Sequence, residues 1–337
     1  MVMTTNPRLS IGLPVYNGES LLAEAVEALL GQSYKDFELI IADNASTDGT
    51  AEICRSYEAQ DARIRYIRHP KNIGMVANHN FLVGVARGEF FKWGSHDDLY
   101  GGDYLQRCVD ALDEHPEAVL AHSWCVLMNE AGDLIQFFKY PEATASPQAP
   151  LRFRSLLFDG PSDWTYAVFR TSVLRKTPLH ASYHGGDRTL LAELALHGTL
   201  YQVPDWLYFR RDHPNRHLSP RERSMLLDFR RASQSAARLY VEYLWGYASA
   251  IWRSPLPLAE KRACYAHMAQ WLPSRAAPVQ EGEEEVSFRT MPLVYAARRL
   301  SGVFGVRQAP RAAQQMDFEV PDINVNDRVP GRKRAAS

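Results

Sequence analysis

The chain has 337 residues, and 46% of them are hydrophobic, so it can bury an ample core in one large domain with an appendage or in two domains. Lys and Arg number 38 against 39 Asp and Glu, and the formal net charge of −1 removes a broad electrostatic case for nucleic-acid binding. No stretch approaches the ~20 apolar residues of a membrane-spanning helix, and we expect no secretory signal before Arg8.

Strands and helices are predicted to alternate over the first 114 residues. Apolar runs indicate the strands, and the segments between them carry one apolar face at helical spacing. Such alternation favours an α/β fold with parallel strands and right-handed crossovers. The predicted strands are 9–15, 37–42, 64–67 and a short run that ends before Asp97, and the predicted helices are 20–32, 48–58, 75–87 and 102–114.

The rest of the chain is less regular. A fifth strand is predicted at 118–125, a hairpin turn at 129–133 leads into a strand at 134–138, and 140–150 reads as a loop. Residues 151–211 mix helices with short strands, including a strand pair near 200–209. After His217 we expect helices at 221–252, 258–272 and 292–303, so the predicted organisation is an α/β domain over 1–217, a helical extension over 218–306 and a disordered tail over 307–337.

The four cysteines are far apart in the sequence and form no pair with the spacing of a metal site. They are typical of reduced thiols, which predicts a cytoplasmic protein. The residues are Cys54, Cys108, Cys125 and Cys264.

Polar side chains follow each of the first four predicted strands. Because the carboxyl ends of parallel strands meet at one edge of a sheet, and open α/β sheets bind ligands beyond that edge, we expect these side chains to define a single site. They are Tyr16 and Asn17, Asp43 and Asn44, Asn72 and Gly74, and Asp97 and Asp98.

The adjacent acids Asp97 and Asp98 are the strongest chemical signal. Paired carboxylates are hard oxygen ligands suited to Mg²⁺ or Mn²⁺, and such a cation neutralises a phosphate-bearing group. The alternative is that the pair only caps the helix that begins near Gly102. The glycine-rich signatures of dinucleotide-binding and P-loop proteins are absent from the sequence.

Four motifs in order resemble family 2 glycosyltransferases of the GT-A fold. The motifs are Leu13-Pro14-Val15-Tyr16-Asn17-Gly18, then Ile41-Ala42-Asp43-Asn44-Ala45-Ser46-Thr47-Asp48-Gly49-Thr50, then Asn72-Ile73-Gly74, then His96-Asp97-Asp98. The resemblance covers roughly residues 8–217 and implies an inverting enzyme with a Rossmann-like, mostly parallel sheet flanked by helices. It makes 1–217 the catalytic domain.

The resemblance implies which residues bind a nucleotide-sugar donor. Asp43 is expected to accept a hydrogen bond from the N3–H group of uracil, a task that suits an acceptor-only carboxylate. Pro14, Tyr16 and Asn17 would line the base and ribose. Asn44, Asn72, Gly74 and Asp97 complete the donor site on this side, whereas Asp48 is expected to cap its helix.

Asp97 falls on the last acid of the family's metal-binding DxD motif, and Ser95 stands where the first acid is usual. That departure leaves the affinity for metal open, with Asp97, Asp98 and His213 as the predicted ligands of Mn²⁺ or Mg²⁺. His96, at the variable middle position, is interpreted as a bystander.

The family's later segments carry over onto Asp187 and onto Arg210, Arg211 and His213. Asp187 stands where the catalytic base is expected, and its alternative role is to cap the following helix. Arg210 and Arg211 are expected to bind the diphosphate. Trp124, Trp164 and Tyr166 are weaker candidates for contact with the acceptor.

The predicted function is transfer of a sugar from a nucleotide donor, expected to be UDP-linked, to a glycan or lipid-linked hydroxyl in envelope polysaccharide or glycolipid synthesis. The alternatives are a catalytically inactive sugar-nucleotide-binding module and a nucleotidyltransferase. Tyr240, Tyr243, Trp245, Tyr247 and Trp252 either pack between helices or contact a membrane surface peripherally.

Overall fold

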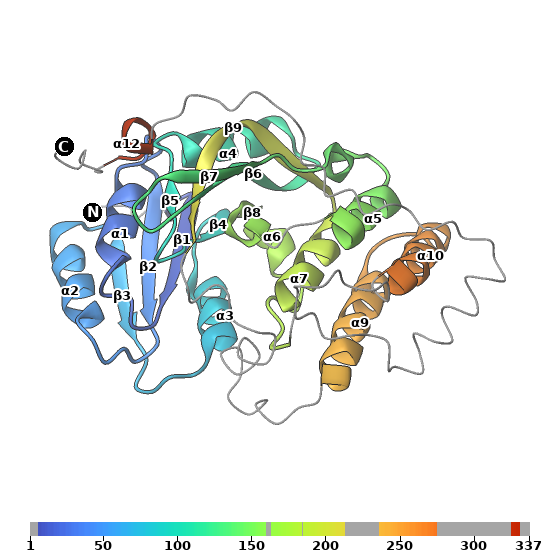
Figure 1. Cartoon of the computed structure of the whole chain (residues 1–337), viewed down its shortest axis with the longest axis horizontal. Coiled ribbons are helices and arrows are strands. Elements are labelled where there is room, and N and C mark those ends of the chain that lie inside the picture. The colour runs from blue at the N-terminus through green and yellow to red at the C-terminus, as the bar shows by residue number, and fades with distance from the viewer. Residues whose placement is uncertain (1–5, 160–162, 184, 213–235, 275–324, 331–337) are drawn as a thin grey trace.

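The protein is described by a computed structural model that covers residues 6–159, 163–183, 185–212, 236–274 and 325–330. One nine-stranded sheet runs through it with the strand order β3-β2-β1-β4-β8-β6-β9-β5, and β7 pairs with β6 (Figure 1). Helices flank the sheet, so the predicted α/β class with a mostly parallel sheet is confirmed.

The first four strands of this order form the parallel half of the sheet. They are β3 (Ile64–Arg68), β2 (Phe37–Asp43), β1 (Leu9–Val15) and β4 (Phe90–Trp93), and each neighbouring pair is parallel. Every residue of β1, β2 and β4 is buried, which is why they read as continuous apolar runs rather than alternating ones.

Four helices lie close to their predicted positions; the first three connect β1 to β4 along the chain, and the fourth follows β5 and leads to β6. They are α1 (Leu22–Leu30), α2 (Thr50–Gln60), α3 (Met75–Val85) and α4 (Tyr104–Glu114). The short strand β5 (Leu99–Tyr100) precedes α4, and Asp103 is the residue that caps the helix N-terminus, although its side chain makes no capping hydrogen bond. The capping alternative for Asp97 and Asp98 is therefore wrong.

The other half of the sheet mixes directions. Strand β6 (Ala118–Met128) pairs with β7 (Leu134–Phe138) through the predicted hairpin, and β8 (Val168–Arg170) lies antiparallel between β4 and β6. The strand pair expected near 200–209 is instead one strand, β9 (Thr199–Arg211), parallel to β6 and antiparallel to β5. This strand carries the chain to the end of β4, where the acid pair lies.

Residues 140–150 are more ordered than the predicted loop. They contain the 3₁₀ helix η1 (Glu142–Ala145) and the start of α5 (Ala149–Asp159). Three short elements follow: the 3₁₀ helix η2 (Asp163–Tyr166), α6 (Thr171–Leu174) and α7 (Gly186–Ala195). Asp187 lies in the first turn of α7.

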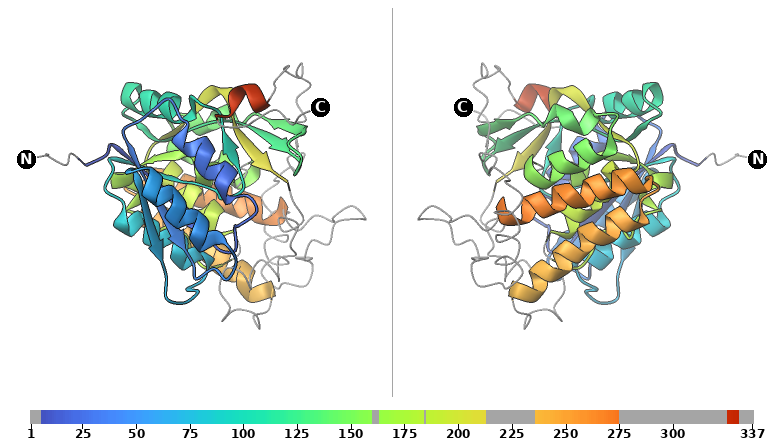
Figure 2. Two further views of the ribbon diagram at one scale, coloured as in Figure 1. Left: turned by 90° about the vertical axis from the view of Figure 1, so that its left-hand side faces the viewer. Right: turned by 90° about the vertical axis from the view of Figure 1, so that its right-hand side faces the viewer.

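The helical extension contains α9 (Ala236–Arg253) and α10 (Leu258–Ser274), which lie across the outer side of α5 and α7 (Figure 2). The four helices share one buried cluster, including Phe153 of α5, Ala192 of α7, Tyr247 of α9 and Cys264 of α10. The extension is thus built onto the main domain through a common core. The predicted boundary at 217/218 and the predicted helix 292–303 lie outside the described residues.

Residues 325–330 correct the expectation of disorder over 307–337. They form the short helix α12 (Val325–Arg328) and a turn, and Val325 and Val329 are each 4% exposed. Both valines join a buried cluster with Leu99 of β5 and Phe209 of β9. Two apolar side chains four residues apart gave too short a pattern to be read as a packed helix from the sequence.

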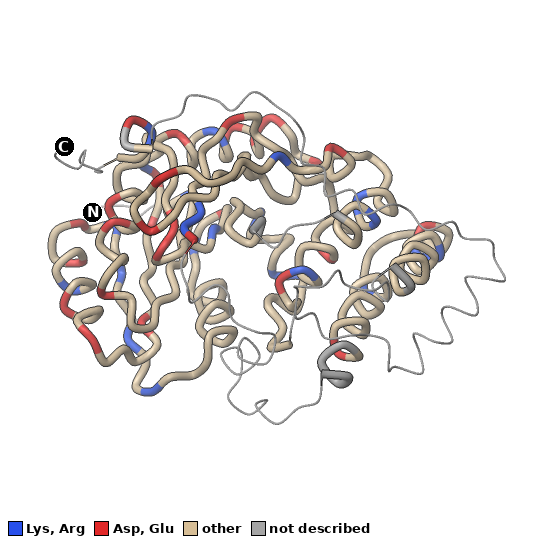
Figure 3. Tube along the Cα trace, viewed as in Figure 1, with Lys and Arg blue, Asp and Glu red and all other residues tan. Residues whose placement is uncertain are grey.

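Among the described residues, no helix is long and apolar enough to cross a membrane. Acidic and basic positions are interspersed along the described elements, as the balanced composition predicts (Figure 3). All four cysteines are free and buried, in agreement with their expected reduced state.

Candidate active site

The segment between β4 and β5, residues 95–98, is called the acidic loop here. All of its residues except His96 are buried, and His96 lies against the turn after β1, where a Cβ added to Gly18 would be 3.1 Å from the imidazole. The acidic loop therefore adjoins the carboxyl end of β1, as the parallel half of the sheet requires.

Asp98 is bound by β9 on both of its carboxylate oxygens. Its Oδ1 accepts a hydrogen bond from the backbone N–H of Arg211 at 2.9 Å, and its Oδ2 accepts one from the Tyr208 hydroxyl at 2.7 Å. The residue has no exposed surface. This geometry disagrees with the prediction that Asp98 is a metal ligand and assigns it to holding the acidic loop against β9.

Arg211 is also an internal anchor. Its guanidinium donates to the backbone carbonyls of Asp97 and Glu130 and pairs with Glu24 of α1 at 2.6 Å. The side chain is 2% exposed, so it is turned into the protein. The predicted diphosphate contact of Arg211 does not agree with this arrangement, because its donors are directed at those three groups.

Asp97 and Ser95 present the oxygen atoms that fit a divalent cation. The Ser95 hydroxyl donates a hydrogen bond to Oδ1 of Asp97, so a carboxylate and a hydroxyl lie together at the end of β4. Both are hard oxygen donors of the kind that Mg²⁺ and Mn²⁺ prefer. Within the described residues no cluster of three or more His, Cys, Asp or Glu side chains could hold a metal, so a cation here would depend on the donor diphosphate and water for further ligands.

The Asp43 carboxylate, which is predicted to accept a hydrogen bond from a nucleotide base, is bonded to protein groups in the structure. It has no exposed surface, and it accepts hydrogen bonds from the Ser46 backbone N–H at 2.8 Å, the Tyr66 hydroxyl at 2.8 Å and Arg68 Nε at 3.2 Å. The half-exposed Arg68 side chain and the Tyr66 hydroxyl share one oxygen, Oδ2, of this carboxylate. Burial, together with the hydrogen bond to Asp43, raises the pKa of Tyr66 well above its usual value.

The other predicted donor residues form a hydrogen-bonded rim along the ends of β1, β2 and β3. Asn17 accepts from Thr47 N–H at 2.9 Å. Asn44 donates to Asn72 at 2.9 Å, and Asn72 also accepts from Gly74 N–H. Pro14 is buried inside β1 opposite Ala42, whereas Tyr16 is 48% exposed just beyond the strand. The structure thus brings these residues together, with Tyr16 and Asn17 outermost.

Asp187 lies in the first turn of α7. The residue that precedes the helix is Gly185, in the left-handed conformation, and the Asp187 carboxylate accepts a hydrogen bond from the N–H of the next residue, Arg188, at 2.9 Å. The alternative of an N-capping aspartate is therefore wrong. The positive end of a helix stabilises a carboxylate at this position.

Lys92, in the middle of β4, was missed as a functional candidate. It has no exposed surface, donates to the Tyr166 carbonyl, and places Nζ 3.9 Å from the Tyr100 ring centroid and 4.6 Å from that of Tyr104. Burial lowers the pKa of Lys92 to about 7, against smaller opposing effects of Cys108 and Asp98. A lone lysine inside an apolar strand was the signal that could have revealed it.

The family model described as Glycosyl transferase family 2 matches residues 10–176, which include β1 to β8 and the acidic loop. These residues belong to glycosyl transferase family 2. The family 2 domain thus contains Asp43, Asp97 and Asp98, whereas Asp187 and β9 lie beyond the matched segment.

Curated relatives agree with this family. EpsE of Bacillus subtilis is 34% identical over 131 residues, which is 39% of this chain and 47% of EpsE. The glycosyltransferase GlyG of Streptococcus pneumoniae is 31% identical over 106 residues, which is 32% of this chain and 35% of GlyG. The match spans less than half the length of these relatives.

Among solved structures, residues 1–349 of TarS from S. aureus in complex with UDP-GlcNAc share the fold. The TM-score is 0.60 at 18% identity, and the alignment covers 86% of this chain and 79% of TarS 1–349. The likeness extends beyond the segment that the family model matches. It supports one continuous fold from β1 through β9.

The remaining predicted residues around the family 2 domain are less informative. Arg210 is half-buried at the end of β9, and His213 lies outside the described residues. The rings of Trp124 and Trp206 are tilted by 56° with their centroids 4.9 Å apart, so Trp124 is explained by packing between strands β6 and β9. The side chain of Trp164 is outside the described part.

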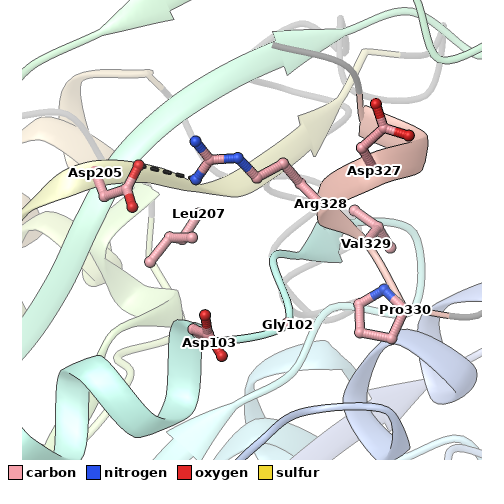
Figure 4. Close-up of a pocket in the computed structure, with 8 residues that line it drawn as sticks. All are labelled: Gly102, Asp103, Asp205, Leu207, Asp327, Arg328, Val329 and Pro330. Carbon is pink, nitrogen blue, oxygen red and sulfur yellow. Dashed lines mark hydrogen bonds and ion pairs between the residues drawn. The ribbon is translucent and has the colours of Figure 1, made fainter.

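A pocket of about 320 Å³ lies away from the acidic loop, between α12, β9 and the start of α4 (Figure 4). Arg328 reaches across it to Asp205, with Nη1 and Oδ1 3.1 Å apart. None of the predicted site residues lines this pocket, so it marks the docking of α12 and not the donor site. The lining residues are Gly102, Asp103, Asp205, Leu207, Asp327, Arg328, Val329 and Pro330.

Proposed function

We propose that the protein is an inverting glycosyltransferase that moves a sugar from a nucleoside diphosphate donor to a hydroxyl acceptor. The observation that carries the proposal is the acidic loop, which a family 2 domain places at the carboxyl end of β4 and which β9 holds through Asp98. UDP is the proposed nucleotide, because TarS, which shares this fold, was crystallised with UDP-GlcNAc.

The proposed transfer needs one base. The acceptor oxygen forms a bond to the anomeric carbon while the bond from that carbon to the diphosphate oxygen breaks. The hydroxyl proton passes to the Asp187 carboxylate, and the electron pair of the broken bond leaves with the diphosphate. Attack comes from the face opposite the nucleotide, so the configuration of the sugar is inverted.

We propose Asp97 and the Ser95 hydroxyl as the protein ligands of a divalent cation, Mg²⁺ or Mn²⁺. When bound, the cation supplies charge neutralisation to the leaving diphosphate. The neighbouring Asp98 keeps the acidic loop in place and is not proposed as a ligand, since Tyr208 and Arg211 already donate to its two oxygens.

The proposed acceptor is a glycan or lipid-linked hydroxyl of envelope polysaccharide or glycolipid synthesis. We propose a cytoplasmic location, which the four free, buried cysteines support. A peripheral contact with the inner face of the membrane is proposed for α9, because Trp245 and Trp252 on it are 72% and 76% exposed. Tyr243 and Tyr247 are 5% and 1% exposed and pack inside instead.

The test is a donor screen with the purified full-length protein. UDP-, GDP- and dTDP-sugars are titrated by calorimetry with Mn²⁺, Mg²⁺ or EDTA, and donor hydrolysis is measured in parallel. Asp97→Ala is expected to lose metal-dependent binding, and Asp187→Ala to keep binding while losing turnover. Asp110→Ala, an exposed acid on α4, is the matched control.

The outcomes separate the competing functions. Binding of a UDP-sugar with turnover that needs Asp187 supports the transferase. If a donor binds but is neither hydrolysed nor used to glycosylate any of several sugar acceptors, the inactive sugar-nucleotide-binding module is favoured. Two observations motivate this alternative: Ser95 stands in the first acid position, and the Asp43 carboxylate is covered. Failure of every nucleotide sugar to bind overturns both, and exchange of pyrophosphate into a nucleoside triphosphate would indicate a nucleotidyltransferase.

A further inference from the structure

The N-terminal end of α7, which carries Asp187, is packed against α9 of the helical extension. Gly185 has a φ of 78°, and a Cβ added to it would lie 2.5 Å from Cε2 of Tyr243. Gly246 of α9 lies against the same segment, where a Cβ would overlap the Tyr183 hydroxyl and lie 3.0 Å from the Thr189 methyl group. Each glycine thus leaves room for a tyrosine side chain of the other element: Tyr243 packs against Gly185, and Tyr183 packs against Gly246.

Polar contacts tighten this junction. The Tyr183 hydroxyl and Thr189 Oγ1 are 3.0 Å apart, so the residue before the turn is tied to the first turns of α7. On α9, the Tyr243 and Tyr247 hydroxyls are 2.5 Å apart, and both tyrosines interact electrostatically with the side chain of Arg188. The residue next to Asp187 therefore faces α9.

The far end of α7 is attached to the same helix. Arg253, the last residue of α9, pairs with Glu193 through two bonds of 3.1 and 2.8 Å. The Glu193 side chain is only 4% exposed, so its carboxylate is shielded from water and the ion pair is stronger than a pair at the surface. A helix fixed at both ends by one partner has little freedom to slide or tilt.

We propose that α9 is a positioning element for the catalytic base: Gly246 and Tyr243 set the place of Asp187 relative to the acceptor hydroxyl. The inference rests on the proposed function, because it takes Asp187 as the base. Neither residue touches the reacting groups. A shift of about 1 Å in a catalytic group can cost roughly 100-fold in rate, so the α7 to α9 junction controls turnover without contacting substrate.

Gly246→Ala tests the proposal in the full-length protein. The added methyl group must displace Tyr183 or α9, and either movement shifts residues 183–187. We expect kcat to fall roughly 10-fold or more while the donor Kd stays within about two-fold, since the donor site lies on other elements. Gly84→Ala in α3 is the matched control, because a Cβ there meets nothing within 4 Å.

Two further variants separate positioning from general loss of structure. Tyr183→Phe combined with Gly246→Ala removes the hydroxyl that the methyl group overlaps, so it is expected to restore part of kcat. Tyr243→Phe keeps the ring but removes the hydroxyl that bonds to Tyr247 and interacts with Arg188, and it should lower kcat by about 3- to 10-fold with donor Kd unchanged.

The results distinguish this proposal from the proposed function. If the wild-type protein binds donor and Asp187→Ala abolishes turnover, but Gly246→Ala and Tyr243→Phe keep kcat within about two-fold of wild type, the positioning proposal is overturned and the function stands. If both variants weaken donor binding in parallel with kcat, the contact is merely structural and the proposal also fails. If Asp187→Ala retains full turnover, the base assignment itself is wrong.

Discussion

Asp97 and Asp98 are adjacent in sequence and differ in their partners. Asp98 accepts from Arg211 and Tyr208 of β9, whereas the side chain of Asp97 accepts from the Ser95 hydroxyl within the acidic loop. From the sequence both acids were predicted metal ligands, with Asp97 on the last acid of the DxD motif, because nothing in a dipeptide reveals which carboxylate a strand more than 100 residues away will bind.

Substitution of the two acids should therefore have different effects. Asp98→Ala leaves the buried Tyr208 hydroxyl and the Arg211 N–H without their acceptor, so we expect it to lower the free energy of unfolding by about 2–4 kcal/mol. Asp97→Ala should lower the free energy of unfolding by less than Asp98→Ala does, while abolishing metal-dependent donor binding. Urea unfolding and calorimetry measure the two effects, and equal losses of stability in both variants would contradict the assignment.

Lys92 makes the free energy of unfolding depend on pH, and the sign of this dependence follows from its lowered pKa. With the folded pKa at about 7, the unfolded chain holds a proton that the folded protein lacks from pH 7 up to the ordinary lysine pKa of 10.5. The free energy of unfolding contributed by Lys92 therefore rises with pH through this window. The groups that face it are the Tyr100 and Tyr104 rings, the Tyr166 carbonyl, and, at longer range, Cys108 and Asp98.

Lys92→Met removes that titration and keeps the volume of the side chain. We expect the wild-type protein to gain about 3 kcal/mol relative to Lys92→Met between pH 7 and 9.5. The Tyr166 carbonyl also accepts a hydrogen bond from the Tyr104 hydroxyl at 3.1 Å. Lys92→Met therefore leaves this carbonyl with a donor, and the difference in stability between the two proteins reports the titration of Lys92. Urea unfolding at both pH values is the measurement, and parallel stability curves would show that Lys92 keeps its charge throughout.

At the scale of elements, α12 shows how a six-residue segment completes the edge of the sheet. Val325 and Val329 fill a cluster with Leu99 and Phe209, the Arg328 carbonyl accepts from Gly102 N–H at 2.8 Å, and Pro330 lies against Gly31 at the end of α1. Leu99 directly follows Asp98, so the segment packs against the strand that follows the acidic loop. Its contact with α1 requires a glycine at position 31.

Gly31→Ala should loosen α12 because the added Cβ would overlap the Pro330 ring. We expect a loss of about 1–3 kcal/mol in the free energy of unfolding, although alanine is ordinarily favoured over glycine near a helix end in the α-region. Gly84→Ala, which has open space, should be neutral or stabilising. In a chain that ends at residue 324, Gly31→Ala should no longer lower the free energy of unfolding. If the same loss is measured in that shortened chain, overlap with Pro330 is not its cause.

On the scale of the whole molecule, the outer face of α9 exposes Trp245 and Trp252, which are seven residues apart and thus on one side of the helix. Arg262 at the start of α10 is also exposed nearby in the sequence. Exposed indoles, together with an exposed arginine on the next helix, suit the interface of an anionic membrane, which combines an apolar layer with negative headgroups.

Replacing both tryptophans with serine should remove binding to vesicles that contain anionic lipid, by roughly 10-fold or more in the partition coefficient. Ile135→Ser, at a 51% exposed position on β7, is the control for loss of an exposed apolar side chain elsewhere. Co-sedimentation measures the binding. Sedimentation of the double variant at the wild-type level would assign the two tryptophans to another partner.

The sequence predicted the parallel half of the sheet and its helices closely, because buried strands and amphipathic helices leave local patterns at β1 to β4. It also predicted the strand ends at which polar residues gather. It could not reveal that Arg68 and Tyr66 occupy the Asp43 carboxylate, that Arg211 turns inward to Glu24, or that α9 and α7 share a core. Those features join residues on different elements, and no local spacing encodes such contacts.

The clamp from Arg211 to Glu24 spans 187 positions of the chain, and the bond from Tyr208 to Asp98 spans 110. Contacts of such sequence separation close large loops and form slowly during folding. β1 to β4 can be made and paired during synthesis well before β9 has left the ribosome, yet the acidic loop has no support until that strand arrives. A nascent chain should thus form the parallel half of its sheet early and fix its acidic loop only after β9 has been synthesised.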